Sequence, residues 1–445
     1  MKLELNPKGS YVSDGKFNQY EALKDVGVRA ALCFKETVNN EAIAPSDIRN
    51  SESDAILINR GLSTIYSDHT TPSEHQNITL ELTGIPKILC MILNNEKQYT
   101  ADERSLRYTE VEPNEYITEK EKMLYDKWLI KLEEVIWNQY KDFYMKQSKD
   151  NETRAKKAVH KIAQENARYM ISVFMPTSIS YTVPWIQINK IMVYMKRIID
   201  NPMNELESML VPYLKEFINL CTEKNVTITK NSIYEVANKN SEVKEKLYKT
   251  HPEIKDYCGS DEFIYNNNKN VDLSLFAYRN KFSGINSDNE YGYTISYNNY
   301  ESWACLAQEH RHRTIDCEML IPDRFYSYIP QVFNCKYELV NEWVNDINSV
   351  KNVYPQGQMI KVNRIGSLKS IIKFVGQERA CSRAQLEIER SYTSHIIPTI
   401  YEELKEKGDK ELVKVLKPYV NKLRCQYPDY NCPSPCGNRR LNRKI

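Results

Sequence analysis

Two stretches far apart along the chain follow the same plan, and this repetition constrains the fold more than any other feature. In the first, apolar and polar side chains alternate from Ile78 to Leu82, which predicts a half-buried strand, and the apolar run after Gly84 predicts a buried helix. Residues 291–308 alternate in the same way and again lead into a helix-like segment. The apolar stripe at 367–375 also resembles the one at 186–197. We therefore predict two copies of one architecture in a single chain.

The segments between these stretches give the expected boundaries. Residues 117–170 have a strongly helical pattern with a break at Asn151, which predicts a helical hairpin, and a second helical pair is expected around Pro202. The polar, Asn- and Lys-rich stretch after it is the best candidate for a linker or peripheral segment. The predicted divisions are 1–221 for the first copy, 222–270 for the linker, 271–410 for the second copy and 411–445 for a cysteine-containing tail.

Composition excludes several classes of protein. The chain has 445 residues, of which 41% are apolar and 27% charged, as in an ordinary soluble globular protein of two or three domains. A net charge of +2 gives no broad attraction to nucleic acid or to an anionic membrane. No apolar stretch is long enough to span a bilayer, and the N-terminus lacks the apolar run of a signal peptide. We expect a cytoplasmic protein whose eleven cysteines are mostly reduced thiols.

Three polar clusters carry the candidate chemistry: HTTPSEH at 69–75, ERSLRY at 103–108 and QEHRHR at 308–313. In an extended chain Glu103, Ser105 and Arg107 point the same way, and together they suit a ligand with a phosphate and a polar ring. The same alternation would put Arg311 and Arg313 on one side, where their charges favour a bound anion. Each cluster also has a plain interpretation: a solvated strand face, a surface basic patch, or a helix-capping turn.

Taken together, the clusters resemble one family. Flavin-dependent thymidylate synthases carry an H-x-T-P-F-E-H turn, the motif R-H-R-x-x-S-x-x-E-x-S-x-R and a late R-x-D-x-x-A-Q-x-E-I helix. In the first half of this chain, 69–75 match the turn with Ser73 in place of Phe, and 103–108 match the end of the long motif. The R-H-R positions are instead occupied by 95–97, Asn-Glu-Lys.

Two further segments extend the resemblance through the first half. Residues 165–168 match a family E-x-A-R segment, and Arg197 fits the late arginine, although Pro202 and Met203 stand where A-Q is expected.

The second half shows the opposite losses. Residues 308–313 match the family's Q-x-x-R-H-R, but no E-x-S-x-R follows in register. Residues 379–388 match the late helix closely, with Cys381 in place of Asp, and Lys369 stands at an upstream arginine position. In this family the enzyme is a homotetramer in which the two arms of a site come from neighbouring subunits. The surviving halves are complementary, so we expect one composite site per chain and a homodimer that acts as a pseudo-tetramer.

The resemblance implies an α+β fold, with two tandem copies of a mainly antiparallel sheet packed with long helices. It also implies FAD-dependent transfer of a one-carbon unit from 5,10-methylenetetrahydrofolate to C5 of dUMP, giving dTMP, with NADPH as the reductant. The dUMP-binding residues would be Gln308, Arg311, Glu103, Ser105, Arg107 and Arg197. The FAD-binding residues would be Thr71, Glu74, Glu103, Arg311, His312, Arg313 and Lys369. Catalytic roles would fall to Ser105 and to an arginine that stabilises negative charge on the ring, with Arg197 expected first and Arg379 second.

Two alternatives stay open. The chain could install another C5 group, such as hydroxymethyl, on a pyrimidine nucleotide, or it could be a non-catalytic nucleotide-binding relative. No metal is required, although Cys425, Cys432 and Cys436 could ligate zinc with a fourth partner such as Cys258. A proline-rich surface tail is the preferred interpretation of that region.

Overall fold

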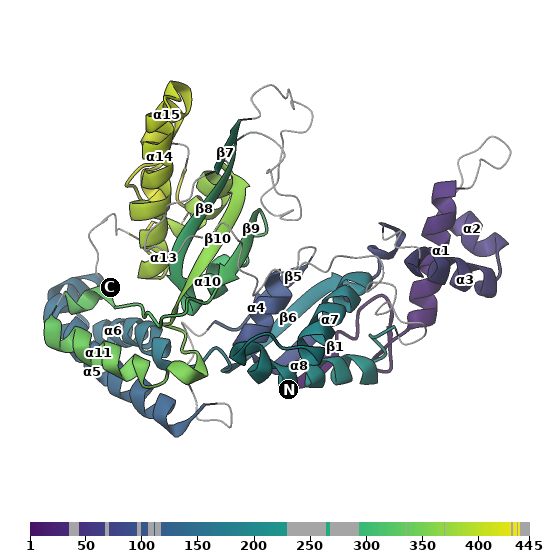
Figure 1. The fold of residues 1–445 in the computed structure, drawn as a ribbon, viewed down its shortest axis with the longest axis horizontal. Helices are drawn as coiled ribbons and strands as arrows, with labels where there is room; N and C mark the ends of the chain where they lie inside the picture. The colour runs from purple at the N-terminus through teal and green to yellow at the C-terminus, as the bar shows by residue number, and fades with distance from the viewer. Residues whose placement is uncertain are drawn as a thin grey trace. The chain divides into compact units, whose positions relative to one another are not determined.

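The computed structural model describes residues 1–34, 44–66, 71–95, 99–105, 111, 117–228, 264–267, 293–334, 336–368, 370–428, 430–433 and 435–436. Its internal contacts divide the chain into two compact units (Figure 1). Unit 1 consists of 1–104 and 176–245, and unit 2 consists of 105–175 and 246–445. These boundaries differ from those predicted for the two copies, because the helical hairpin of the first half belongs by its contacts to unit 2.

Unit 1 is built on a four-stranded antiparallel sheet in the order β1-β4-β6-β5. Its strands are β1 (Lys2–Leu5), β4 (Asn77–Pro86), β5 (Thr100–Glu103) and β6 (Pro176–Pro184). The strand predicted around 78–82 is therefore confirmed. Its alternation places Ile78, Leu80 and Leu82 on the buried face. Helix α4 (Lys87–Asn95) follows β4 directly, as the apolar run after Gly84 predicted.

Helices complete unit 1. Helices α7 (Trp185–Asp200) and α8 (Glu205–Glu223) are separated at the predicted break near Pro202. Near the N-terminus lie the short strands β2 (Val12–Ser13) and β3 (Lys16–Phe17), followed by α1 (Gln19–Phe34), α2 (Pro45–Ser51) and α3 (Asp54–Tyr66). Helices α1 and α3 approach so closely that a Cβ added to Gly27 would lie 2.0 Å from the backbone oxygen of Leu57. Only glycine permits this crossing.

The predicted helical hairpin is confirmed and belongs to unit 2. Helix α5 spans Glu119–Gln147 and helix α6 spans Glu152–Ala167. Thr118 caps α5 through a capping box, and the side chain of Asn151 caps α6, which is why the chain breaks there. An aromatic core joins α5 to α11 (Tyr337–Asn348): the rings of Trp128 and Trp343 lie 4.9 Å apart.

The sheet of unit 2 repeats the order found in unit 1. It is antiparallel, in the order β7-β8-β10-β9, with β7 (Ile264–Asn267), β8 (Tyr293–Ser302), β9 (Ile315–Leu320) and β10 (Met359–Ser367). In each sheet the edge strand, β1 or β7, is followed in space by three strands. If these three are numbered by their order along the chain, their order across the sheet is first, third, second. Helix α10 (Trp303–Glu309) follows β8 as α4 follows β4. The α+β class with antiparallel sheets is confirmed, and duplication stays a prediction that this shared order supports.

The late helix of unit 2 is not continuous, contrary to expectation. A π-helical segment, Ser370–Gly376, leads into the short helix α12 (Gln377–Arg379), and α13 begins only at Leu386. Ala380 has ψ of 51°, outside the helical range, and its carbonyl oxygen accepts a 2.6 Å hydrogen bond from the backbone N–H of Arg424. The C-terminal segment therefore occupies an acceptor that a continuous helix would use itself.

Further helices close unit 2 beyond α13. They are α14 (Ile397–Glu406) and α15 (Lys410–Leu416), and they pack with the sheet helices around buried residues such as Tyr392, Ile396 and Ile400. Among the described helices, none combines the length and the apolar character that crossing a membrane requires.

Candidate functional site

The turn before β4 places its predicted residues at the surface of unit 1. Residues Thr71–Ser73 form a single 3-10 turn, in which Thr71 is exposed; Glu74, just after it, is partly exposed. Gln76, at the end of the turn, is fully buried and donates a 2.9 Å hydrogen bond to Oδ2 of Asp25. His69 lies outside the described residues.

Asp25 is the hub that holds this turn, and no sequence motif singles it out. Its carboxylate accepts hydrogen bonds from Tyr11, Arg29, Arg49 and Gln76, at 2.5–2.9 Å. Burial by itself would raise the pKa of Asp25, but these donors outweigh it and the net pKa lies below the usual value. The same burial and charge raise the pKa of Tyr11 to about 12.

The E-x-S-x-R segment is described only in part. Glu103 ends β5, its side chain is 4% exposed, and it forms an ion pair with Lys87, the first residue of α4. Lys87 could not be predicted as a partner of Glu103 from the sequence, because the two residues lie on different elements. Ser105 follows β5 and is partly exposed. Arg107 lies outside the described residues, so the predicted shared direction of the three side chains remains a prediction.

The two late arginines lie in different units. Arg197 is in the last turn of α7 in unit 1, partly exposed. Arg379 ends α12 in unit 2, also partly exposed. Arg379 contacts two other predicted site residues of its unit, Gln308 and His312.

The Q-x-x-R-H-R motif folds as a helix end and turn, not as extended chain. Gln308 lies on α10, and the backbone N–H of His312 donates to the carbonyl of Glu309 at 2.9 Å. The expected strand-like alternation of Arg311 and Arg313 is therefore wrong. Arg311 is exposed, and His312 and Arg313 are partly exposed.

Arg379 joins this turn through two hydrogen bonds. Its Nε donates to Nε2 of His312 at 2.7 Å, and its Nη2 donates to the carbonyl oxygen of Gln308 at 2.8 Å. The imidazole nitrogen must be unprotonated to accept, so His312 is neutral here with its proton on Nδ1. Both acceptors are uncharged, so neither forms an ion pair with the guanidinium.

Gln385, from the A-Q of the late motif, extends the contact. The side-chain amide of Gln308 and the guanidinium of Arg168 both donate to Oε1 of Gln385. In turn Gln385 donates to the hydroxyl of Tyr169, which donates to Glu387 at 2.6 Å. The E-x-A-R segment of the first half thus meets both surviving motifs of the second half inside unit 2. This convergence was not foreseen from the sequence.

Glu387 anchors the network to the sheet. Its carboxylate accepts from both the backbone N–H and the hydroxyl of Ser302, at 2.8 and 2.7 Å. Burial raises the pKa of Glu387, opposed by the hydrogen bonds from Tyr169 and Ser302. The network therefore fixes α10 relative to the late segment from both ends.

Among its described residues, the cysteine tail shows no gathered ligand set. Cys425 and Cys432 are partly buried, and Cys436 is exposed, with its Sγ 3.3 Å from the hydroxyl of Ser382. Cys258 lies outside the described residues. Over the described part of the chain, the metal-type group whose ligand atoms lie within 4.8 Å of one another is elsewhere, at Glu301, Cys305 and Glu309.

A cavity of about 430 Å³ lies within the α5–α6 hairpin. Its lining includes Trp137 and an ion pair between His160 and Glu133. No predicted site residue lines it, so the candidate site is defined by the convergence of motifs and not by this cavity.

The geometry defines an α+β protein whose second sheet carries a partly exposed, arginine-rich turn suited to an anionic ligand. Comparison with known families finds a match for part of the chain. Residues 18–188 match the family model Thy1, thymidylate synthase complementing protein, which is the flavin-dependent thymidylate synthase family. The predicted resemblance to this family is confirmed for that part of the chain. No curated protein was found to match the chain.

Proposed function

We propose that the protein catalyses FAD-dependent transfer of a one-carbon unit from 5,10-methylenetetrahydrofolate to C5 of dUMP, giving dTMP, with NADPH as the reductant. The observation that carries the proposal is the meeting of Gln308 and His312 with Arg379 and Gln385 in unit 2. These residues belong to two separate motifs of the resemblance, and they converge although both motifs lie outside the matched region 18–188. The family match itself supports flavin-dependent thymidylate synthesis in general.

Arg379 is the better candidate for stabilising negative charge on the uracil ring. Its guanidinium donates to two uncharged acceptors, and within the described residues its Nη1 makes no hydrogen bond. A preorganised cation of this kind stabilises charge that develops in the transition state. Arg197, which we expected first, lies on α7 in unit 1.

The residues of the turn fit an anionic cofactor. Arg311 is exposed and Arg313 is partly exposed, beside the neutral imidazole of His312, and guanidinium groups are the donors that hold a diphosphate. When bound, FAD supplies the redox chemistry, and these side chains supply binding and orientation. Thr71 and Glu74 in unit 1 are accessible for the same purpose. Lys369 lies outside the described residues.

Glu103 would orient a ligand by accepting a hydrogen bond, and not by attracting it with an unpaired charge. Its carboxylate is neutralised by Lys87 and almost fully buried, so it can accept from a ligand donor in a fixed direction. Ser105, beside it in sequence, is partly exposed, and its hydroxyl would suit a phosphate or ring oxygen.

The division of motifs between two copies supports one composite site per chain. Both sheets share one strand order, and each copy has lost the motif that the other retains. A duplicated chain of this kind would replace a tetramer by a homodimer, with the former subunit contacts within each chain.

The test begins with the visible spectrum of the protein after FAD is added and the excess is removed by gel filtration. Retained flavin, followed by formation of dTMP from dUMP, methylenetetrahydrofolate and NADPH, is the expected result. Arg379→Gln should lower kcat/KM about 100-fold, as removal of one charge-stabilising donor does. The control Arg154→Gln, on the exposed start of α6, should leave it unchanged.

Two outcomes would contradict the proposal. Protein that stays colourless and cannot be loaded with FAD would leave a nucleotide-binding relative as the better account. A product whose mass exceeds that of dTMP by one oxygen atom would instead establish hydroxymethylation.

A further inference from the structure

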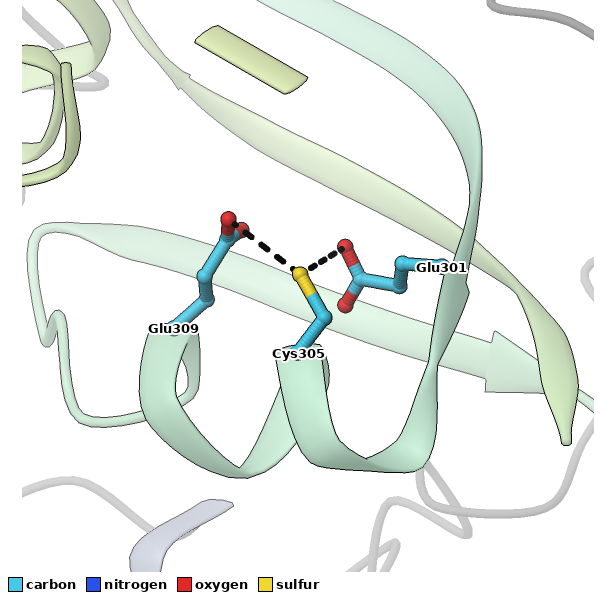
Figure 2. Close-up of side chains that lie close together, drawn as sticks. All are labelled: Glu301, Cys305 and Glu309. Atoms are coloured by element: carbon cyan, nitrogen blue, oxygen red, sulfur yellow. Dashed lines mark hydrogen bonds between the residues drawn. The ribbon is translucent and has the colours of Figure 1, made fainter. Parts of the chain in front are cut away.

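Three ligand-type side chains converge between β8 and α10, below the surface that carries the arginine turn. Glu301 lies at the end of β8, and Cys305 and Glu309 follow on α10, one and two helical turns further on. Figure 2 shows the thiol between the two carboxylates. The Sγ atom lies 3.8 Å from Oε2 of Glu301 and 3.7 Å from Oε1 of Glu309, and all three residues are buried.

Arg364 of β10 holds the other oxygen of each carboxylate. Its Nη2 lies 2.6 Å from Oε1 of Glu301 and 2.8 Å from Oε2 of Glu309. Each carboxylate is therefore fixed by one oxygen and directs the second at the sulfur. Carboxylates that bind metal ions are oriented in this way by partners on their outer oxygens.

The hydrogen count leaves this set incomplete. A thiol has one hydrogen, whereas two buried carboxylate oxygens face Cys305. With both carboxylates ionised, one of these oxygens lacks a donor within the described residues, and an unmet acceptor with no access to water is destabilising. In that ionised state the two carboxylates share the guanidinium of Arg364.

The first half of the chain shows that the fold does not need these polar groups. If 311–313 correspond to 95–97, then Glu301, Cys305 and Glu309 correspond to 85, 89 and 93. Those positions are Ile85, Leu89 and Leu93, all fully buried, and α4 packs on its sheet with them.

We propose that Glu301, Cys305 and Glu309 bind one divalent transition-metal ion, with Zn²⁺ favoured by the mixture of thiolate and carboxylate ligands. Typical Zn–S and Zn–O bonds, joined at a tetrahedral angle, put sulfur and oxygen about 3.6 Å apart, close to the two separations found here. When the metal–sulfur bond forms, the thiol proton leaves to solvent. Two carboxylates and a thiolate then balance the metal ion and the guanidinium of Arg364.

The bound ion would tie α10 to β8, and through Arg364 to β10. Since α10 carries Gln308 and the arginine turn, the metal would set the position of the candidate site without taking part in its chemistry. Metal binding at these three residues does not depend on the proposed reaction, and it can be measured without flavin or nucleotide.

The probe is Co²⁺, added to metal-depleted full-length protein and followed by absorbance. A thiolate-to-cobalt charge-transfer band that saturates at about one ion per chain, and competition by Zn²⁺, are expected. Cys305→Val should abolish the band, and Glu309→Gln should weaken Co²⁺ binding at least tenfold. Two controls should keep it: Cys90→Val, a buried thiol on α4, and Cys432→Ser in the tail.

The folding of each variant is checked by far-UV circular dichroism. Wild-type protein that shows no thiolate–cobalt band and no bound zinc after loading would overturn the proposal, whatever the variants do. A band that survives Cys305→Val and disappears in Cys432→Ser would also overturn it, and would place the metal in the tail.

Discussion

The carboxylate of Asp25 offers the sharpest test of how unit 1 holds its turn. Asp25 is 7% exposed and accepts hydrogen bonds from four side chains on four different segments: Tyr11, Arg29, Arg49 and Gln76. We predict that Asp25→Asn lowers the stability of unit 1 by about 3 kcal/mol.

The magnitude follows from burial. The side chains of Arg29 and Arg49 are 35% and 56% exposed, so solvent screens their charge and each contributes little. The hydroxyl of Tyr11 and the buried amide of Gln76 lose a charged acceptor, at roughly 1.5 kcal/mol each.

The effect should depend on pH with a defined sign. The pKa of Asp25 is lowered in the folded protein, so at acid pH the unfolded chain binds more protons than the folded one. The stability that Asp25 contributes is therefore fully present above its unfolded pKa of about 3.9, and it is lost as pH falls through the lower folded value. The difference between wild type and Asp25→Asn should shrink over that range.

Hydrogen exchange with mass spectrometry is the suitable assay, because a chain with two units need not unfold in one transition. Peptides covering α1 report on unit 1 alone. The control is Asp54→Asn, whose carboxylate is 70% exposed and 3.1 Å from Lys24; it should change stability by less than about 0.5 kcal/mol. If Asp25→Asn changes the stability of unit 1 at neutral pH by as little as this control does, Asp25 does not hold the turn in place.

Three further predictions follow from single contacts. Gly27→Ala should destabilise unit 1 by about 2 kcal/mol or more, because its Cβ would meet the backbone oxygen of Leu57; full exchange protection of α1 in this variant would contradict the close crossing. Thr118→Ala removes the cap of α5 and should lower unfolding free energy by about 1 kcal/mol, seen as a lower urea midpoint for the hairpin. His312→Ala frees the guanidinium of Arg379 and should raise the KM for the nucleotide roughly fivefold, the effect of one hydrogen bond; an unchanged KM would show that this contact does not orient Arg379.

Much of the fold could be predicted from local patterns. The strand at 77–86 and the helix after it follow from apolar alternation and an apolar run, and the hairpin break follows from a capping residue, Asn151. The interruption after Arg379 could not be predicted, because it depends on a hydrogen bond from Arg424, far along the chain. Nor could the turn at 310–314, where backbone bonds to the end of α10 replace the extended chain that alternation implied.

The sequence by itself determined which side chains are available for chemistry and which family the first half resembles, since motif spacing is a local property. It also carried one overlooked signal: Glu301, Cys305 and Glu309 recur at helical spacing. Only the tertiary structure decided that Arg168 meets Gln385, that Lys87 neutralises Glu103, and that Arg364 draws two carboxylates toward one thiol. These partners lie on separate strands and helices, and only the packing of those elements, driven by burial of apolar surface, brings their charges together.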